Sequence, residues 1–170
     1  TGYQVQDLVP EVAIRTKRSD PTFAALLDAS QRLDLMVGFV HEDERQRYYT
    51  AAAYLSGGEV VHIHHKIYLP TYGMFDEGRY FDQGEHIRAF NTRFGRVGML
   101  ICEDFWHTSP AYVLWLDGAD MLLFQSASPS RGLDEPCSQP HSRPPSQVEG
   151  VAQRPRPRPG GHPRSRQLRR

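Results

Sequence analysis

The chain has 170 residues, 39% of them hydrophobic, and its 20 Lys and Arg balance 20 Asp and Glu to a formal net charge of zero. Such a chain can bury the core of one ordinary domain, and it contains no apolar stretch of membrane-spanning length and no signal-peptide pattern. Its two cysteines, Cys102 and Cys137, lie far apart and give no disulfide framework, so we expect a cytoplasmic protein.

The zero net charge hides two different segments. Residues 1–132 carry 12 Lys and Arg against 17 Asp and Glu, whereas residues 133–170 carry 8 Arg against 3 acids and hold 8 of the 13 prolines. The second segment has too few aliphatic residues to offset the entropy of ordering. We therefore predict a folded domain over 1–132 and a Pro/Arg-rich tail over 133–170 that is disordered or non-native.

The first half of the domain predicts a helix followed by three strands. Asp20 and Pro21 are typical of a helix start. The apolar face of this helix is formed by Phe23, Leu26, Leu27 and Leu33. Apolar runs then predict strands over 35–41, 48–55 and 60–66, and the last two are joined by a hairpin turn at 56–59.

The second half begins with a loop and ends with a helix between two strands. Prolines, glycines and charges predict a loop over 67–86, and long loops in compact domains tend to carry function. Strands are expected over 87–91 and 96–101, a helix between Ser109 and Gly118, and a last strand over 119–125. Strands joined partly by hairpins and partly by helices indicate an α/β fold with a mixed sheet.

Cys102 stands at the end of an apolar strand, in the stretch GRVGMLICEDFWH that covers 95–107. Backbone N–H groups of the turn that follows can point at the same place, where they favour a thiolate and can receive an oxyanion. Free cysteines are also among the most buried residues, so the position by itself favours an inert core thiol.

Lys66 and Glu77 lie in the stretch HHKIYLPTYGMFDEGRYFDQG, residues 64–84, where several aromatic residues surround them. In such surroundings a lysine can stabilise developing negative charge, and a carboxylate can hold that lysine or move protons. Taken singly, each residue is more typical of a solvated surface side chain.

Together, these two stretches and GADMLLFQSASPSRG, residues 118–132, resemble in order and spacing the lysine, glutamate and cysteine motifs of the nitrilase, or carbon–nitrogen hydrolase, superfamily. The likeness includes the opening TGYQVQDL and covers residues 1–132. It looks most like the glutamine-hydrolysing amidase domain of NAD synthetases and its stand-alone relatives. It implies an α-β-β-α sandwich, incomplete here at both ends, and attack of a cysteine thiolate on an amide or nitrile carbon.

The resemblance also implies the role of each site residue. Cys102 would be the nucleophile that forms a thioester-type acyl-enzyme, and Lys66 with the backbone N–H of Glu103 would hold the oxyanion. Glu77 would match the second glutamate of the family, and Trp106 would line the substrate pocket. The substrate would be a small amide or nitrile, no metal or organic cofactor is implied, and the complete protein is expected to be a homo-oligomer.

The first glutamate of the family's catalytic triad has no counterpart here. It normally lies in an F-P-E segment a few residues before the T-G-Y that begins this chain. Glu11, in Val9-Pro10-Glu11, lies on the other side of that T-G-Y and is expected to be a surface acid. We therefore expect this chain to be impaired by the roughly 10²–10⁴-fold that loss of a proton-transfer group costs.

Three questions stay open at this point. His62, His64 and His65 could suggest a metal site, but a further ligand at suitable spacing is not apparent. The chain could also be a non-catalytic interaction module whose basic tail binds nucleic acid or an SH3-like partner, although intact site residues make this the second interpretation. Within the superfamily, glutamine and simple aliphatic or carbamoyl amides fit equally well as substrates.

Overall fold

The computed structural model describes residues 5–127 and, for the backbone, 150–153. The elements in chain order are η1 (Gln6–Leu8), α1 (Val9–Val12), α2 (Pro21–Ala29), β1 (Leu35–Glu42), β2 (Tyr48–Ser56), β3 (Glu59–His65), α3 (Glu77–Tyr80), β4 (Phe90–Thr92), β5 (Gly95–Ile101), η2 (Cys102–Trp106), α4 (Thr108–Leu116), β6 (Met121–Gln125) and β7 (Gly150–Gln153).

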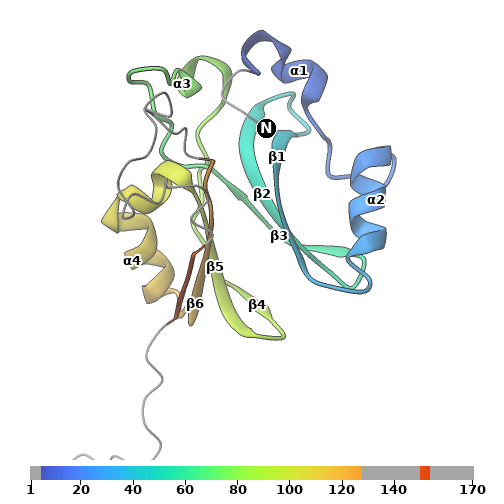
Figure 1. Cartoon of the computed structure of the whole chain (residues 1–170), viewed down its shortest axis with the longest axis vertical. Helices are drawn as coiled ribbons and strands as arrows, with labels where there is room; N and C mark the ends of the chain where they lie inside the picture. Colours follow the sequence, from blue (N-terminus) through green and yellow to red (C-terminus); the bar gives the residue numbers. More distant parts are fainter. Residues whose placement is uncertain (1–4, 128–149, 154–170) are drawn as a thin grey trace, which may run out of the picture.

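The described elements form four layers (Figure 1). One sheet has the order β1-β2-β3, and the other has the order β4-β5-β6-β7. Among the described strands, every pair is antiparallel except β5 and β6, which are parallel and are joined by a crossover connection that contains α4. Helix α2 lies on the outer side of the first sheet and α4 on the outer side of the second. The predicted α-β-β-α arrangement is confirmed.

The central strand β2 is buried on both faces, and its residues alternate between two layers. Ala53 and Leu55 pack in one apolar cluster with Phe23 of α2. Ala52 and Tyr54 belong to the cluster that fills the space between the two sheets. Because successive side chains of a strand point to opposite faces, β2 packs against α2 on one face and against the second sheet on the other.

In the second sheet, strand β5 likewise packs against other layers on both of its faces. Met99 and Ile101 lie in the cluster between the sheets, whereas Leu100 packs with Leu114 of α4. A Cβ atom at Gly98 would lie only 2.7 Å from Leu114 Cδ1, so the glycine lets α4 approach the sheet closely. This packing fixes the end of β5, where the candidate nucleophile follows.

The start of helix α2 agrees with the sequence, but its end does not. The backbone N–H of Phe23 donates to Asp20 Oδ1 at 3.0 Å, as expected for a helix cap. The helix ends at Ala29, and Leu33 beyond it is 50% exposed instead of part of the apolar face. The Ser30 hydroxyl donates to the carbonyl of Leu27, which competes with continuation of the helix.

Two other elements differ from expectation. The predicted loop contains the one-turn helix α3, and β4 begins at Phe90 rather than at residue 87. Residues 150–153 form β7, which pairs with β6, although no strand is apparent in the sequence there. The rest of the predicted tail lies outside the described residues, so the domain boundary at 132 stays a prediction.

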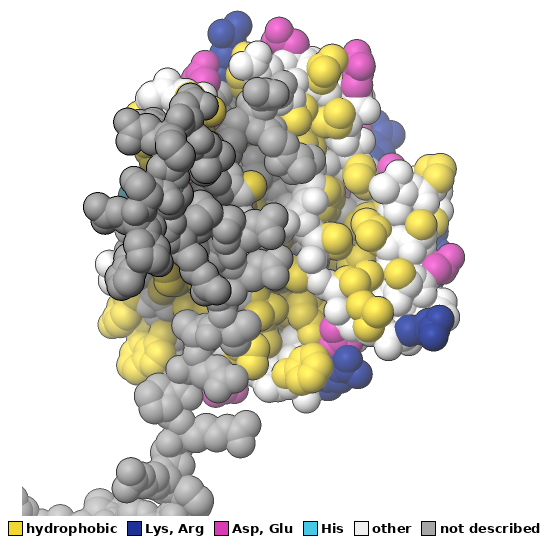
Figure 2. Space-filling view, viewed as in Figure 1, with side chains coloured by type: hydrophobic (Ala, Val, Ile, Leu, Met, Phe, Trp, Pro, Cys, Tyr) yellow, Lys and Arg dark blue, Asp and Glu magenta, His cyan; other side chains and the backbone are white. Residues whose placement is uncertain are grey.

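On the face seen in Figure 2, Lys, Arg, Asp and Glu lie mainly along the outer edge, and hydrophobic side chains are spread over the right-hand part of the face and along its lower edge. Across the described parts of the chain, every helix is too short or too polar to cross a bilayer.

Candidate active site

Lys66 and Glu77 form a buried ion pair. The Lys66 Nζ donates to both carboxylate oxygens of Glu77 at 2.7 Å, and the lysine is only 2% exposed. Burial raises the pKa of Glu77, and the Lys66 ammonium offsets part of that shift. The carboxylate therefore holds the ammonium in one place and orientation, as a group that stabilises charge requires.

Backbone hydrogen bonds fix both members of this pair. The N–H of Lys66 donates to the Thr50 carbonyl at 2.9 Å, which continues the β2–β3 ladder by one residue. The Lys66 carbonyl accepts from the N–H of Gly84 at 2.8 Å, and the N–H of Glu77 donates to the Pro70 carbonyl at 3.0 Å. The long loop is thus tied to the strand end at several points, and α3 presents its first residue to the lysine.

Cys102 follows β5 directly and is the first residue of η2. Its backbone φ is +44°, in the left-handed region that residues with a side chain seldom adopt. The chain turns sharply at this point, and the thiol is half-buried at the end of the strand. A sharp strand-to-helix turn is a known means of presenting a nucleophile at the edge of a sheet.

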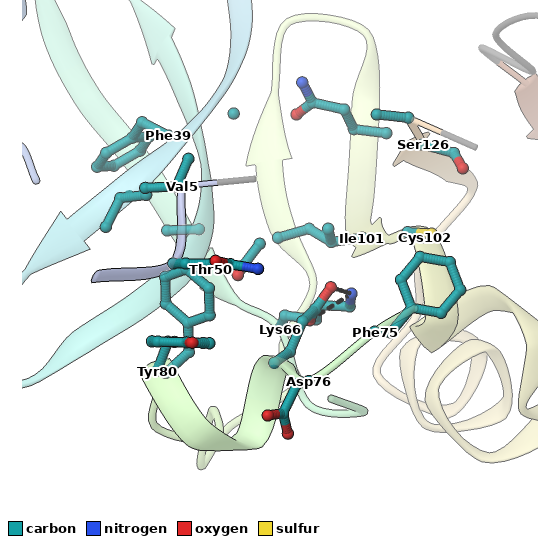
Figure 3. Close-up of a pocket in the computed structure, with 18 of the residues that line it drawn as sticks. Val5, Phe39, Thr50, Lys66, Phe75, Asp76, Tyr80, Ile101, Cys102 and Ser126 are labelled. Atoms are coloured by element: carbon teal, nitrogen blue, oxygen red, sulfur yellow. Dashed lines mark hydrogen bonds and ion pairs between the residues drawn. The ribbon is translucent and has the colours of Figure 1, made fainter. Parts of the chain in front are cut away.

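The three residues meet at one cavity of about 540 Å³. Lys66, Glu77 and Cys102 all line it, and Figure 3 shows Phe75 beside Cys102 and the Lys66 ammonium bound to its partner carboxylate. The wall also contains Phe39, Thr50, Asp76, Arg79, Tyr80 and Gln125. A cavity of this size that combines apolar walls with polar and charged groups is typical of a site for a small molecule.

Two other predicted site residues lie elsewhere. Trp106 is 79% exposed and does not belong to the described lining of the cavity, so the structure does not bring it to the expected pocket wall. The Glu103 carboxylate accepts from the Tyr72 hydroxyl at 2.8 Å, which raises the pKa of that hydroxyl. Glu103 therefore links η2 to the loop that contains Tyr72. Its side chain is not part of the described lining of the cavity.

Glu11 is an exposed residue of α1 and is not among the described residues that line the cavity.

The three histidines of β3 have separate surroundings. His62 stacks on Phe90 with ring centroids 4.5 Å apart, and His64 binds Asp104. His65 hydrogen-bonds to His41 at 2.8 Å between ring nitrogens. Within residues 5–127, no group of three or more His, Cys, Asp and Glu residues could hold a metal ion.

Asp104 is a site residue whose role the sequence did not reveal. Its side chain is fully buried, and its carboxylate accepts four hydrogen bonds from the segments next to Lys66 and Cys102. The sequence does show an acidic residue two positions after the cysteine, but an acidic residue at this position is equally typical of the start of a helix.

Known proteins resemble the chain in sequence and structure. The sequence model of the carbon-nitrogen hydrolase family matches residues 1–154. A glutamine-dependent NAD(+) synthetase of Thermotoga maritima is 35% identical over 131 residues, which are 75% of this chain and 22% of that protein. An N-carbamoylputrescine amidase of Arabidopsis thaliana is 27% identical over 121 residues, covering 69% of this chain and 40% of that protein.

The structural comparison agrees with the sequences. The glutamine-dependent NAD+ synthetase of Acinetobacter baumannii, solved in complex with adenosine diphosphate, superimposes with a TM-score of 0.66 and 32% identity over 76% of this chain and 24% of that protein. The chain thus spans about a quarter of the length of the NAD synthetases that it matches. With a family match over most of its length, a four-layer fold and a cysteine, lysine and glutamate at one cavity, the chain belongs to the carbon-nitrogen hydrolase family.

Proposed function

We propose that the protein hydrolyses a non-peptide carbon–nitrogen bond of a small amide or nitrile through an acyl-enzyme on Cys102. The observation that carries this proposal is the convergence of Cys102 with the Lys66–Glu77 pair on one cavity. A thiol that lines the same cavity as a fixed ammonium and carboxylate is an arrangement suited to nucleophilic attack on a carbonyl carbon.

For an amide, Cys102 Sγ forms a bond to the carbonyl carbon, and the electron pair of the C=O bond moves onto the oxygen. The buried Lys66 ammonium and the backbone N–H of Glu103 would stabilise that oxyanion. The C–N bond then breaks, and ammonia or an amine leaves with the proton taken from the thiol. Water attacks the resulting thioester and releases the acid.

Glu77 serves in this scheme to hold Lys66 and to order the attacking water. Both of its oxygens are already engaged by the lysine, so it is a poor first acceptor of the thiol proton. For this reason we also propose that the 170-residue chain, tested by itself, turns over slowly. An upstream segment that carries the family's first glutamate should restore the rate by about 10²–10⁴-fold.

The substrate class follows from the cavity and from the names of the relatives. A volume of about 540 Å³ suits a small molecule. Glutamine and carbamoyl amides are the first substrates to test, because relatives are named for a dependence on glutamine and for N-carbamoylputrescine. A homo-oligomer remains our proposal for the complete protein.

The test uses the natural protein that contains these 170 residues, which is called the full-length protein below. Its release of ammonia is measured from glutamine, N-carbamoylputrescine, propionamide and propionitrile. Release from at least one compound is expected, together with a mass increase on the peptide that contains Cys102 when the reaction is quenched early. Cys102→Ala should abolish both signals, whereas Cys137→Ala, which removes the other cysteine, should leave them unchanged. Ammonia release that persists in Cys102→Ala would refute the proposal.

A further inference from the structure

The two central groups of the site come from different sheets. Lys66 directly follows β3 in the first sheet, and Cys102 directly follows β5 in the second. The space between the sheets is filled by apolar side chains such as Tyr54 and Met99. Apolar packing stabilises but has no preferred direction, so it does not by itself fix the thiol relative to the ammonium.

A single carboxylate connects the two strand ends. Asp104 Oδ1 accepts the N–H groups of Ile67 at 3.0 Å and Tyr68 at 2.8 Å, the two residues that follow Lys66. Its Oδ2 accepts the N–H of Ile101 at 3.1 Å, the residue that precedes Cys102. Asp104 thus holds the backbone beside the lysine and the backbone beside the cysteine at the same time.

His64 completes this arrangement. Its Nε2 lies 2.9 Å from Asp104 Oδ2, and both side chains are almost fully buried. Because an ionised carboxylate accepts hydrogen bonds and cannot donate them, Nε2 carries the hydrogen. His64 lies in β3, two residues before Lys66, so Asp104 is bonded to the chain on both sides of the lysine.

We propose that Asp104, supported by His64, is a positioning residue that sets the distance between Cys102 and Lys66 across the two sheets. The inference rests on the proposed function. Asp104 is not among the described residues that line the cavity, so it acts through its neighbours and not by touching the substrate. Misplacement of a reacting group by about 1 Å can cost on the order of 10²-fold in rate.

Asparagine cannot replace this aspartate. The four hydrogen-bond donors use both carboxylate oxygens, whereas an amide offers one oxygen and one NH₂ group. In one orientation the NH₂ group faces the N–H of Ile101, and in the other it faces those of Ile67 and Tyr68. Either way, a backbone donor beside Cys102 or Lys66 loses its acceptor.

The experiment compares Asp104→Asn, His64→Phe and the control Asp117→Asn in the full-length protein. The Asp117 carboxylate is a matched control because it also accepts hydrogen bonds, from the backbone N–H of Ala89 at 2.7 Å and from the Arg96 side chain at 2.9 Å. It lies at the end of α4 that is remote from Cys102. We expect kcat to fall about 100-fold in Asp104→Asn and about 10-fold in His64→Phe, with KM changed less than about threefold, and no change in Asp117→Asn.

Each rate is expressed per reactive thiol, counted by iodoacetamide labelling of Cys102 in a Cys137→Ala background. A variant that merely folds less well has fewer reactive thiols but a normal rate for each of them. His64→Phe keeps three of the four hydrogen bonds to Asp104, so it remains informative if Asp104→Asn does not fold. An unchanged rate per thiol in the variants that fold would overturn the proposal.

A binding measurement separates this inference from the proposed function. Butyraldehyde reacts reversibly with a thiol: an S–C bond forms, the C=O electron pair moves to the oxygen, and the thiol proton ends on that oxygen. The resulting oxygen lies where Lys66 would act, so butyraldehyde affinity should fall about 100-fold in Lys66→Met and in Asp104→Asn, while iodoacetamide labelling changes little.

If these losses occur without ammonia release by the unmodified protein, hydrolysis is refuted and the positioning role stands. If ammonia is released but Asp104→Asn binds butyraldehyde normally, the positioning role is refuted and hydrolysis stands. If Lys66→Met does not change butyraldehyde affinity, Cys102 and Lys66 do not act together, and the positioning role fails with it.

Discussion

The Lys66 ammonium is a charge that the fold keeps away from water, and Glu77 is what makes that possible. An unpaired ammonium in such a place is costly because it loses its hydration, whereas two oxygens at 2.7 Å satisfy two of its three hydrogens. The pair therefore belongs to the stability of the domain as well as to the chemistry of the site. Removing either partner should affect both.

The residue-scale prediction concerns Glu77→Ala. It leaves the buried Lys66 ammonium without its carboxylate, so we expect the free energy of unfolding to fall by about 3–5 kcal/mol. Urea denaturation measures this change. The control is Glu85→Ala, which removes a half-exposed ion pair with Arg47 and should cost less than about 1 kcal/mol. Equal losses in the two variants would show that the Lys66–Glu77 pair is not buried as described.

At the scale of elements, the helices and strands follow the sequence where side chains decide locally. Asp20 and Pro21 specify the start of α2, and the apolar runs at 35–41 and 48–55 became β1 and β2. Leu33 shows the limit of such reasoning. Its spacing fits the helix face, yet local hydrogen bonds of Ser30 end the helix first, and periodicity alone does not register that competition.

The cap of α2 gives the element-scale prediction. Asp20→Ala removes the acceptor for the N–H of Phe23, so the free energy of unfolding should fall by about 1 kcal/mol. Asp28→Ala, near the other end of the same helix, removes only a surface ion pair with Arg18 and should change it by less than about 0.5 kcal/mol. The comparison is made by urea denaturation followed by circular dichroism. A loss in Asp28→Ala as large as that in Asp20→Ala would contradict it.

Across the whole molecule, histidines that are partly or fully withdrawn from water couple stability to pH. Burial, with a smaller contribution from the charge of neighbouring histidines, lowers the pKa of His62 and of His65 from 6.5 to about 4. Both remain neutral in the folded chain between these values, while the unfolded chain binds protons. The unfolded state is therefore favoured as the pH falls.

The whole-molecule prediction follows from that sign. The free energy of unfolding should be highest above about pH 6.5 and decrease as the pH falls towards about 4. Urea midpoints measured at a series of pH values test this. His62→Phe should flatten the decrease by removing one of the contributing groups, and His86→Phe, at an exposed position, should not. A decrease of equal slope in all three proteins would contradict the assignment.

The site shows the same division between what the chain order reveals and what it does not. Lys66, Glu77 and Cys102 could be proposed from the sequence, because the stretches 64–84 and 95–107 that contain them resemble family motifs in order and spacing. The role of Asp104 could not be proposed in this way. It depends on hydrogen bonds from two strand ends, in different sheets, to one carboxylate. The order of residues along the chain does not show that these two strand ends lie close together in space.

The backbone at Cys102 has a consequence for how such a chain changes over time. At a φ of +44° a side chain is unfavourable by roughly 1 kcal/mol, and glycine is the residue that adopts this conformation at no steric cost. Selection for stability alone would therefore drive position 102 towards glycine and erase the thiol. Under the function proposed above, the reactivity of the thiol outweighs this backbone preference at position 102.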